Sequence, residues 1–86
     1  KNSEDWNIVL DSFRDNLISI DVRHLEMPLP MTTILENLET LEEGKALFVN
    51  HKKIPVFLLS ELHERNYNYL IKEEGANEVK LIIYKK

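Results

Sequence analysis

The 86-residue chain contains no cysteine. This absence excludes disulfides, thiolate metal sites, cysteine nucleophiles and persulfide carriage. Glycine is also scarce, with two residues, and no Gly-rich phosphate-binding loop can be placed. Long hydrophobic runs are missing as well, since apolar stretches such as residues 46–49 and 81–84 are far too short to span a bilayer. The sequence therefore predicts no transmembrane helix.

Motifs typical of enzymes are absent too. The chain has no Ser-His-Asp order, no His-Glu-x-x-His and no paired carboxylates that can be assigned to a cleft. The acidic pairs at residues 42–43 and 73–74 are typical of solvated turns. We therefore expect a protein that is not an enzyme, and we assign no catalytic residue.

The chain has fewer positive than negative residues, with 11 Lys and Arg against 15 Asp and Glu, for a formal net charge of −4. Such a field repels nucleic acid, whose nonspecific binding depends on Lys and Arg neutralising phosphates. The first five residues also lack the apolar segment of a secretory signal. We expect a cytoplasmic protein that binds neither nucleic acid nor membrane.

The composition is otherwise that of a globular protein, with 43% hydrophobic and 30% charged residues. A chain of this length forms a single core. We expect an N-terminal extension over residues 1–16 and the domain proper over residues 17–86.

The N-terminal segment has two competing patterns. Apolar residues recur at helical spacing between residues 3 and 14, among them Trp6 and Val9, and this spacing favours a helix. The alternation of Trp6, Ile8 and Leu10 also fits a strand, so that alternative stays open.

The rest of the chain alternates strand and helix patterns, separated by its few prolines and glycines. We expect strands over residues 17–22, 45–50, 67–72 and 78–84, and helices over residues 31–41 and from Pro55 towards Asn66.

This β-α-β-α-β-β order constrains the topology. A strand, helix and strand joined by short connections form a right-handed crossover with parallel strands, whereas the last two strands form an antiparallel hairpin. The sequence therefore predicts an α+β fold, a two-layer sandwich with a four-stranded mixed sheet, two helices on one face and an additional N-terminal helix. An exposed edge of this sheet could support a homodimer.

One segment carries a recognisable motif. Within residues 20–31, an Asp-x-Arg-x-Leu sequence leads into Pro-x-Pro through Asp21, Arg23, Leu25, Pro28 and Pro30. This motif resembles the signature of the sulfur-carrier (TusA/SirA-like) family, in which Asp-x-Arg-Gly-Leu runs into Cys-Pro-x-Pro. Residues 41–47 are similar to the turn before that family's second strand, so the resemblance covers about residues 17–86.

Two departures from that signature decide what the resemblance implies. Met27 stands where the family has its sulfur-bearing cysteine, and His24 stands where it has glycine. A thioether cannot form a persulfide, so sulfur transfer is not implied. The chain is more similar to a cysteine-less sister group of uncharacterised bacterial domains, which tend to have a histidine near the end of the second strand, as His51 is here. This likeness implies a fold and no defined activity.

The candidate site lies where the two predicted parallel strands end, since ligands of open sheets usually bind at that edge. Both following helices also begin there and add positive potential through their N-termini. Six residues are candidate ligand-binding residues: Arg23, His24, Met27, His51, Lys52 and Lys53. We expect a noncatalytic binding or adaptor module that docks an acidic protein partner or a small anion at this basic edge.

A first alternative is that these loops are solvated and bind nothing specific, because exposed charges often contribute little. Arg23 would then pair with Asp21 or Glu26 and fix the loop.

A second alternative is a metal- or haem-binding protein associated with redox or respiratory physiology. In that case His24, Met27 and His51 would converge on a soft metal such as copper(I), or on haem iron. Their spacing supports no defined metal site, so we assign no metal ligand and no cofactor.

Overall fold

The computed structural model describes residues 3–85. Its elements in chain order are α1 (Ser3–Ser12), a 3₁₀ turn η1 (Arg14–Asn16), β1 (Leu17–Asp21), α2 (Leu29–Glu39), β2 (Ala46–His51), α3 (Val56–Glu64), β3 (Tyr67–Gly75) and β4 (Glu78–Lys85). The predicted α+β order is confirmed, and the N-terminal segment is a helix rather than the alternative strand. No helix in this part of the chain is long and apolar enough to cross a membrane.

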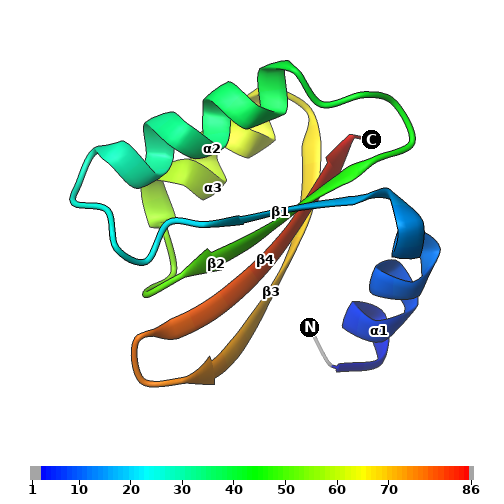
Figure 1. The fold of residues 1–86 in the computed structure, drawn as a ribbon, viewed down its shortest axis with the longest axis horizontal. Coiled ribbons are helices and arrows are strands. Elements are labelled where there is room, and N and C mark those ends of the chain that lie inside the picture. Colours follow the sequence, from blue (N-terminus) through cyan, green and yellow to red (C-terminus); the bar gives the residue numbers. More distant parts are fainter. Residues whose placement is uncertain (1–2, 86) are drawn as a thin grey trace.

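The four strands form one mixed sheet in the order β1-β2-β4-β3. Strands β1 and β2 are parallel, as expected for a crossover through α2, whereas β4 is antiparallel to both β2 and β3. Helices α2 and α3 lie together on one face of the sheet, and α1 lies on the other (Figure 1). The predicted pair of helices on one face is therefore confirmed.

The larger core lies between the sheet and helices α2 and α3. Each helix contributes buried residues four positions apart, a spacing that places them on one face. The strands contribute every second residue, because alternate side chains point to the same face. Its most buried members are Ile34, Leu38, Leu58, Leu62, Leu47, Val49, Leu81 and Ile83.

A second, smaller core lies between the opposite sheet face and α1. It joins Trp6 to buried residues of the three longer strands: Ala46, Leu70 and Ile82. The Trp6 ring meets Phe48 edge to face, with ring centroids 6.0 Å apart. Strand β2 is therefore covered on both faces, which explains why residues 46–49 are continuously apolar. The helix of the predicted extension thus supplies part of the core.

Two residues with left-handed backbone lie in the connections that follow the helices α3 and α2. Asn66 has φ 66° just after α3, where the sequence predicted a helix stop. Gly44 has φ 85°, but α2 already ends at Glu39, earlier than the predicted end at residue 41. Leu41 is nevertheless buried at 5% exposure, so its apolar character reflects core packing outside the helix.

We expect Trp6→Ala to lower the free energy of unfolding by about 3 kcal/mol, because it removes the main anchor of α1 from the second core. Urea denaturation followed by circular dichroism measures this change. Ile8→Ala is the matched control, since Ile8 is 63% exposed and its truncation should cost less than about 0.5 kcal/mol. Equal stability of the two variants would show that α1 does not contribute to the fold.

Candidate functional site

The carboxyl ends of β1 and β2 lie side by side, with Asp21 opposite Asn50 in register. The loops that leave them lead into α2 and α3, as the sequence predicted. Strand alternation nevertheless separates the side chains at this edge, because neighbouring residues of a strand point to opposite faces. Asn50 shares the sheet face that α1 covers, and His51 shares the face that α2 and α3 cover.

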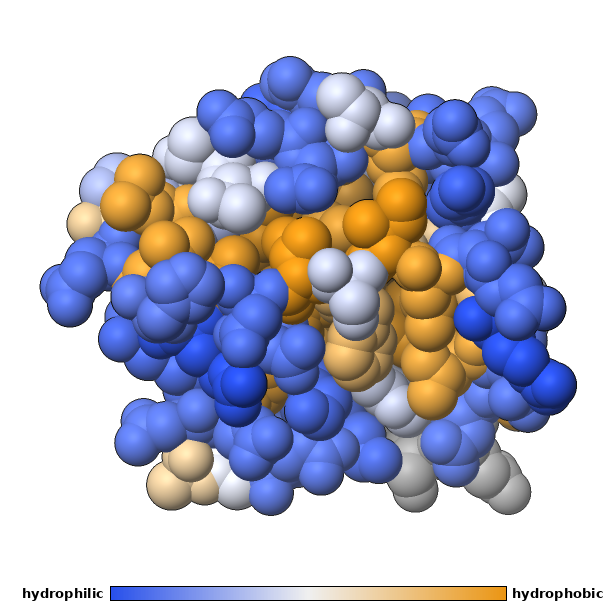
Figure 2. All heavy atoms as spheres, in the orientation of Figure 1, coloured by the Kyte–Doolittle hydropathy of each residue, from blue (hydrophilic) through white to orange (hydrophobic). Residues whose placement is uncertain are grey.

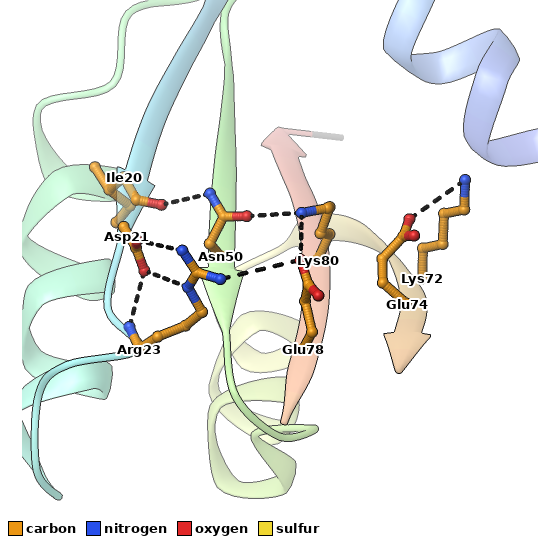
Figure 3. A network of polar contacts seen from close by, with 8 residues as sticks. All are labelled: Ile20, Asp21, Arg23, Asn50, Lys72, Glu74, Glu78 and Lys80. Carbon is orange, nitrogen blue, oxygen red and sulfur yellow. Dashed lines mark hydrogen bonds and ion pairs between the residues drawn. The ribbon is translucent and has the colours of Figure 1, made fainter. Parts of the chain in front are cut away.

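Arg23 is paired within the chain. Its Nε donates to Asp21 Oδ1 at 2.9 Å, its Nη2 donates to Asp21 Oδ2 at 2.8 Å, and its backbone N–H donates to Oδ1 at 3.0 Å (Figure 3). Nη1 lies 4.0 Å from Glu78 Oε2. The guanidinium fork is therefore occupied. Of the two pairings that the sequence left open, the structure shows Arg23 paired with Asp21 and not with Glu26.

The pair continues as a polar network across the sheet. Lys80 Nζ donates to Asn50 Oδ1 at 3.0 Å and lies 3.5 Å from Glu78 Oε2, while Asn50 Nδ2 donates to the carbonyl oxygen of Ile20 at 3.5 Å (Figure 3). Asn50, Glu78 and Lys80 occupy strand positions that point away from α2 and α3. This network therefore balances its own charges on the sheet face opposite His51.

His51 is buried, at 2% exposure. Its Nδ1 accepts hydrogen bonds from the backbone N–H of Lys52 at 3.0 Å and of Lys53 at 3.3 Å. Because Nδ1 acts as an acceptor, the proton of the neutral ring sits on Nε2. Burial lowers the pKa of His51, and the positive charges of Lys53 and Lys52 lower it further. His51 is therefore a neutral ring that closes the turn between β2 and α3.

A pocket of about 200 Å³ opens where α2 and α3 begin. Its lining consists of Met27, Met31, His51, Lys53, Ile54, Pro55, Val56, Phe57 and Leu58. Of the six predicted site residues, Met27, His51 and Lys53 are thus brought together. Arg23, His24 and Lys52 are exposed and do not line this pocket.

Sequence reasoning missed the apolar part of this site. Five large apolar side chains in this region are exposed to solvent, at 37% to 78%. Four of them line the pocket, namely Met27, Ile54, Val56 and Phe57, and the fifth, Leu29, is the first residue of α2. Figure 2 shows apolar side chains at the left of the view, where α2 and α3 begin in Figure 1, in addition to a broader apolar area across the centre and right. The sequence did contain a signal of this apolar surface. Val56 and Phe57 are apolar residues in the first turn of a predicted helix, where polar or acidic residues are usual. We call these five residues the apolar rim.

Neither helix that starts at the pocket has a side-chain N-cap. Pro28 and Pro55 occupy the N-cap positions, and the first turns of α2 and α3 contain no acidic residue. The first N–H groups of a helix lack partners within the helix and carry partial positive charge. In α2, however, the Leu29 N–H donates to the carbonyl oxygen of Glu26 at 2.9 Å and Pro30 has no N–H, so the free donors come mainly from the first turn of α3. The pocket therefore combines apolar walls with donors of α3 that favour an acceptor or an anion.

A metal centre has little support in this arrangement. Among residues 3–85, no three or more His, Asp and Glu side chains are grouped so that they could hold a metal ion. Ligation through Nε2 of His51 would require the proton to move to Nδ1, where it would face two N–H donors. The thioethers of Met27 and Met31 do line the same pocket.

A family model described as an uncharacterised conserved protein, DUF2249, matches residues 19–85. The match runs from β1 to β4 and leaves out α1. No curated protein and no solved structure shows significant similarity to the chain.

We expect Asp21 to titrate far below the ordinary aspartate pKa of about 3.9, because hydrogen bonds from the Arg23 side chain and backbone stabilise its charged form. Carboxyl-detected NMR titration measures this. Arg23→Ala should return the pKa of Asp21 towards its ordinary value, whereas Arg14→Ala, which alters an exposed pair with Asp11, should leave it unchanged. An ordinary titration of Asp21 in the unmodified protein would contradict the pairing.

The lowered pKa of His51 predicts a loss of stability in acid. The unfolded chain takes up a proton at this residue below a pH of about 6.5, whereas the folded protein resists it. His51→Asn should reduce the loss, because the Asn side-chain oxygen can still accept from the Lys52 and Lys53 N–H groups but does not titrate. Urea unfolding midpoints at pH 8 and pH 5 test this, and equal acid losses in both proteins would refute it.

Proposed function

The chain belongs to the DUF2249 family of uncharacterised conserved proteins, and we propose that this member is a noncatalytic binding module that docks an acidic segment of a protein partner. The docking surface comprises the pocket, the apolar rim and the two lysines of the β2–α3 turn. We further propose that the fold is related to the sulfur carriers, on the strength of the Asp-x-Arg-x-Leu and Pro-x-Pro match. Met27 would then stand at the position of the carriers' cysteine. The edge would still bind a partner but would have lost the sulfur chemistry.

The observation that carries this proposal is the apolar rim. Phe57 is 78% exposed and Val56 is 68% exposed, although both sit next to a pocket. Isolated apolar residues on a surface need no explanation, but a cluster of them typically marks an interaction site. A small anion inside the pocket would leave most of this rim in water, so a protein partner explains the surface better.

The expected charge of the partner follows from the surroundings of the pocket. Lys52 and Lys53 are exposed, and neither forms a side-chain ion pair with a residue of the described range. The pocket lining contains no Asp or Glu, and the uncapped helices add positive potential. An acidic segment would gain electrostatic attraction here even though the whole chain is negative.

The partner chemistry is testable by selecting peptides from a random displayed library against the immobilised protein. We expect enriched peptides to combine a large apolar residue with Asp or Glu. Phe57→Ser should weaken the best peptide at least about tenfold by removing a central apolar contact. Lys53→Ala should weaken it about threefold at low salt and less at high salt.

Two substitutions away from the pocket provide matched controls. Ile8→Ser removes an exposed apolar side chain from α1, and Lys45→Ala removes a partly exposed lysine, paired with Glu42, just before the start of β2. Both should leave peptide binding unchanged. Selection of neutral or basic peptides, or equal losses in the control variants, would refute the proposed docking surface.

The alternative of a metal- or haem-binding protein depends on His24, Met27 and His51. Titration of the purified protein with haem and with copper(I), followed by absorbance, tests it directly. We expect no saturable spectral change, because Nδ1 of His51 is committed as an acceptor. A saturable change that is lost in His51→Ala would favour the alternative over the docking proposal.

A further inference from the structure

Nε2 of His51, a residue of the pocket lining, has an unused hydrogen-bonding capacity. No residue of the described range accepts a hydrogen bond from it, whereas Nδ1 accepts two. No fully buried side-chain nitrogen or oxygen in that range lacks a partner. Nε2 is therefore not sealed off, and because His51 lines the pocket, we infer that its N–H is accessible from there. A ligand that covers this N–H without supplying an acceptor leaves the donor unpaired at a cost in free energy, so a ligand that supplies an acceptor is favoured.

The backbone adds donors to the same pocket. Pro55 and residues 56–58 of the first turn of α3 form one wall, and this turn has neither a side-chain cap nor an acidic residue. The lining also contains Lys53 and no carboxylate. Together with the Nε2–H of His51, these groups suit a carboxylate, which is acceptor-only and can receive several hydrogen bonds.

The size of the pocket limits the ligand. A cavity of about 150 Å³ lined by apolar side chains holds a molecule the size of benzene. The pocket here, at about 200 Å³, therefore accommodates one leucine- or phenylalanine-sized group with little room beyond it. Its occupant must place a carboxylate and a compact apolar body on the same residue.

Within a protein, the C-terminal residue is where a carboxylate and an apolar side chain share one residue. We propose that the pocket binds the C-terminus of a partner chain whose last residue is large and apolar. The terminal carboxylate meets the His51 Nε2–H and the start of α3, and the terminal side chain fills the apolar cavity. Preceding acidic residues lie near Lys52 and Lys53 at the rim. This inference rests on the proposed function and names the part of the partner that is recognised.

The test uses the full chain and fluorescent acidic pentapeptides, such as Glu-Glu-Ala-Glu-Leu labelled at the N-terminus, in fluorescence anisotropy titrations. Each peptide is made as a free acid and as a C-terminal amide, with Leu, Phe or Lys at the last position. We expect the Leu and Phe free acids to bind, and the amides and the Lys peptide to bind at least about tenfold more weakly, because a charge-assisted hydrogen bond is lost or an apolar contact is missing. Equal binding of acid and amide would overturn the inference.

Two variants of His51 separate its role in the turn from its role in the pocket. His51→Asn keeps an acceptor for the Lys52 and Lys53 N–H groups but removes the Nε2–H, and His51→Gln places an amide N–H near the Nε2 position. We expect His51→Asn to weaken the Leu free acid about tenfold without affecting its amide, and His51→Gln to restore part of the binding. Unchanged binding in a folded His51→Asn protein would overturn the assignment.

The remaining outcomes distinguish this inference from the proposed function. If 4-methylpentanoate alone competes as well as the unlabelled Leu pentapeptide, the pocket is a small-acid site and the partner C-terminus is ruled out. If no free-acid peptide binds, but internal acidic peptides from the displayed library do so in a Phe57-dependent manner, the proposed function stands and the C-terminal inference fails.

Discussion

The double-sided burial of β2 is the constraint on which the rest of the structure depends. Because neighbouring residues of a strand point to opposite faces, the apolar run Ala46–Val49 must supply two cores at once. Leu47 and Val49 face α2 and α3, while Ala46 and Phe48 face α1. The same alternation continues to the end of the strand, where it directs Asn50 to the polar network and His51 to the pocket.

This separation changes the chemistry of the edge. Four groups at the ends of β1 and β4 satisfy one another: Asp21, Arg23, Glu78 and Lys80. With two positive and two negative charges, they leave no net charge to attract a ligand. The groups on the pocket side are of a different kind, because donors there lie beside apolar walls and no carboxylate neutralises them. A donor in apolar surroundings discriminates between ligands more strongly than an exposed charge does, since leaving it unpaired is costly.

His51 links folding to this proposed recognition. Its two backbone hydrogen bonds shape the turn that leads into α3, and they also fix the ring with its proton on Nε2, the nitrogen that we propose as the donor to the ligand. A protonated ring would put an N–H opposite two other N–H groups and add a charge beside two lysines, so the neutral form is favoured. One residue thereby positions the first turn of α3 and supplies a donor next to it.

The sequence by itself determined the order of the elements, the parallel and antiparallel pairings and the edge at which β1 and β2 end, because periodicity, turn residues and short connections are local properties of the chain. It also located Met27, His51 and Lys53 at that edge. Only the tertiary structure decided that the sheet divides the edge, that Glu78 and Lys80 join the pair of Asp21 and Arg23, and that Val56 and Phe57 stay exposed. These outcomes depend on which face each side chain takes and on which charged groups from distant strands come within hydrogen-bonding distance, and no local pattern encodes either.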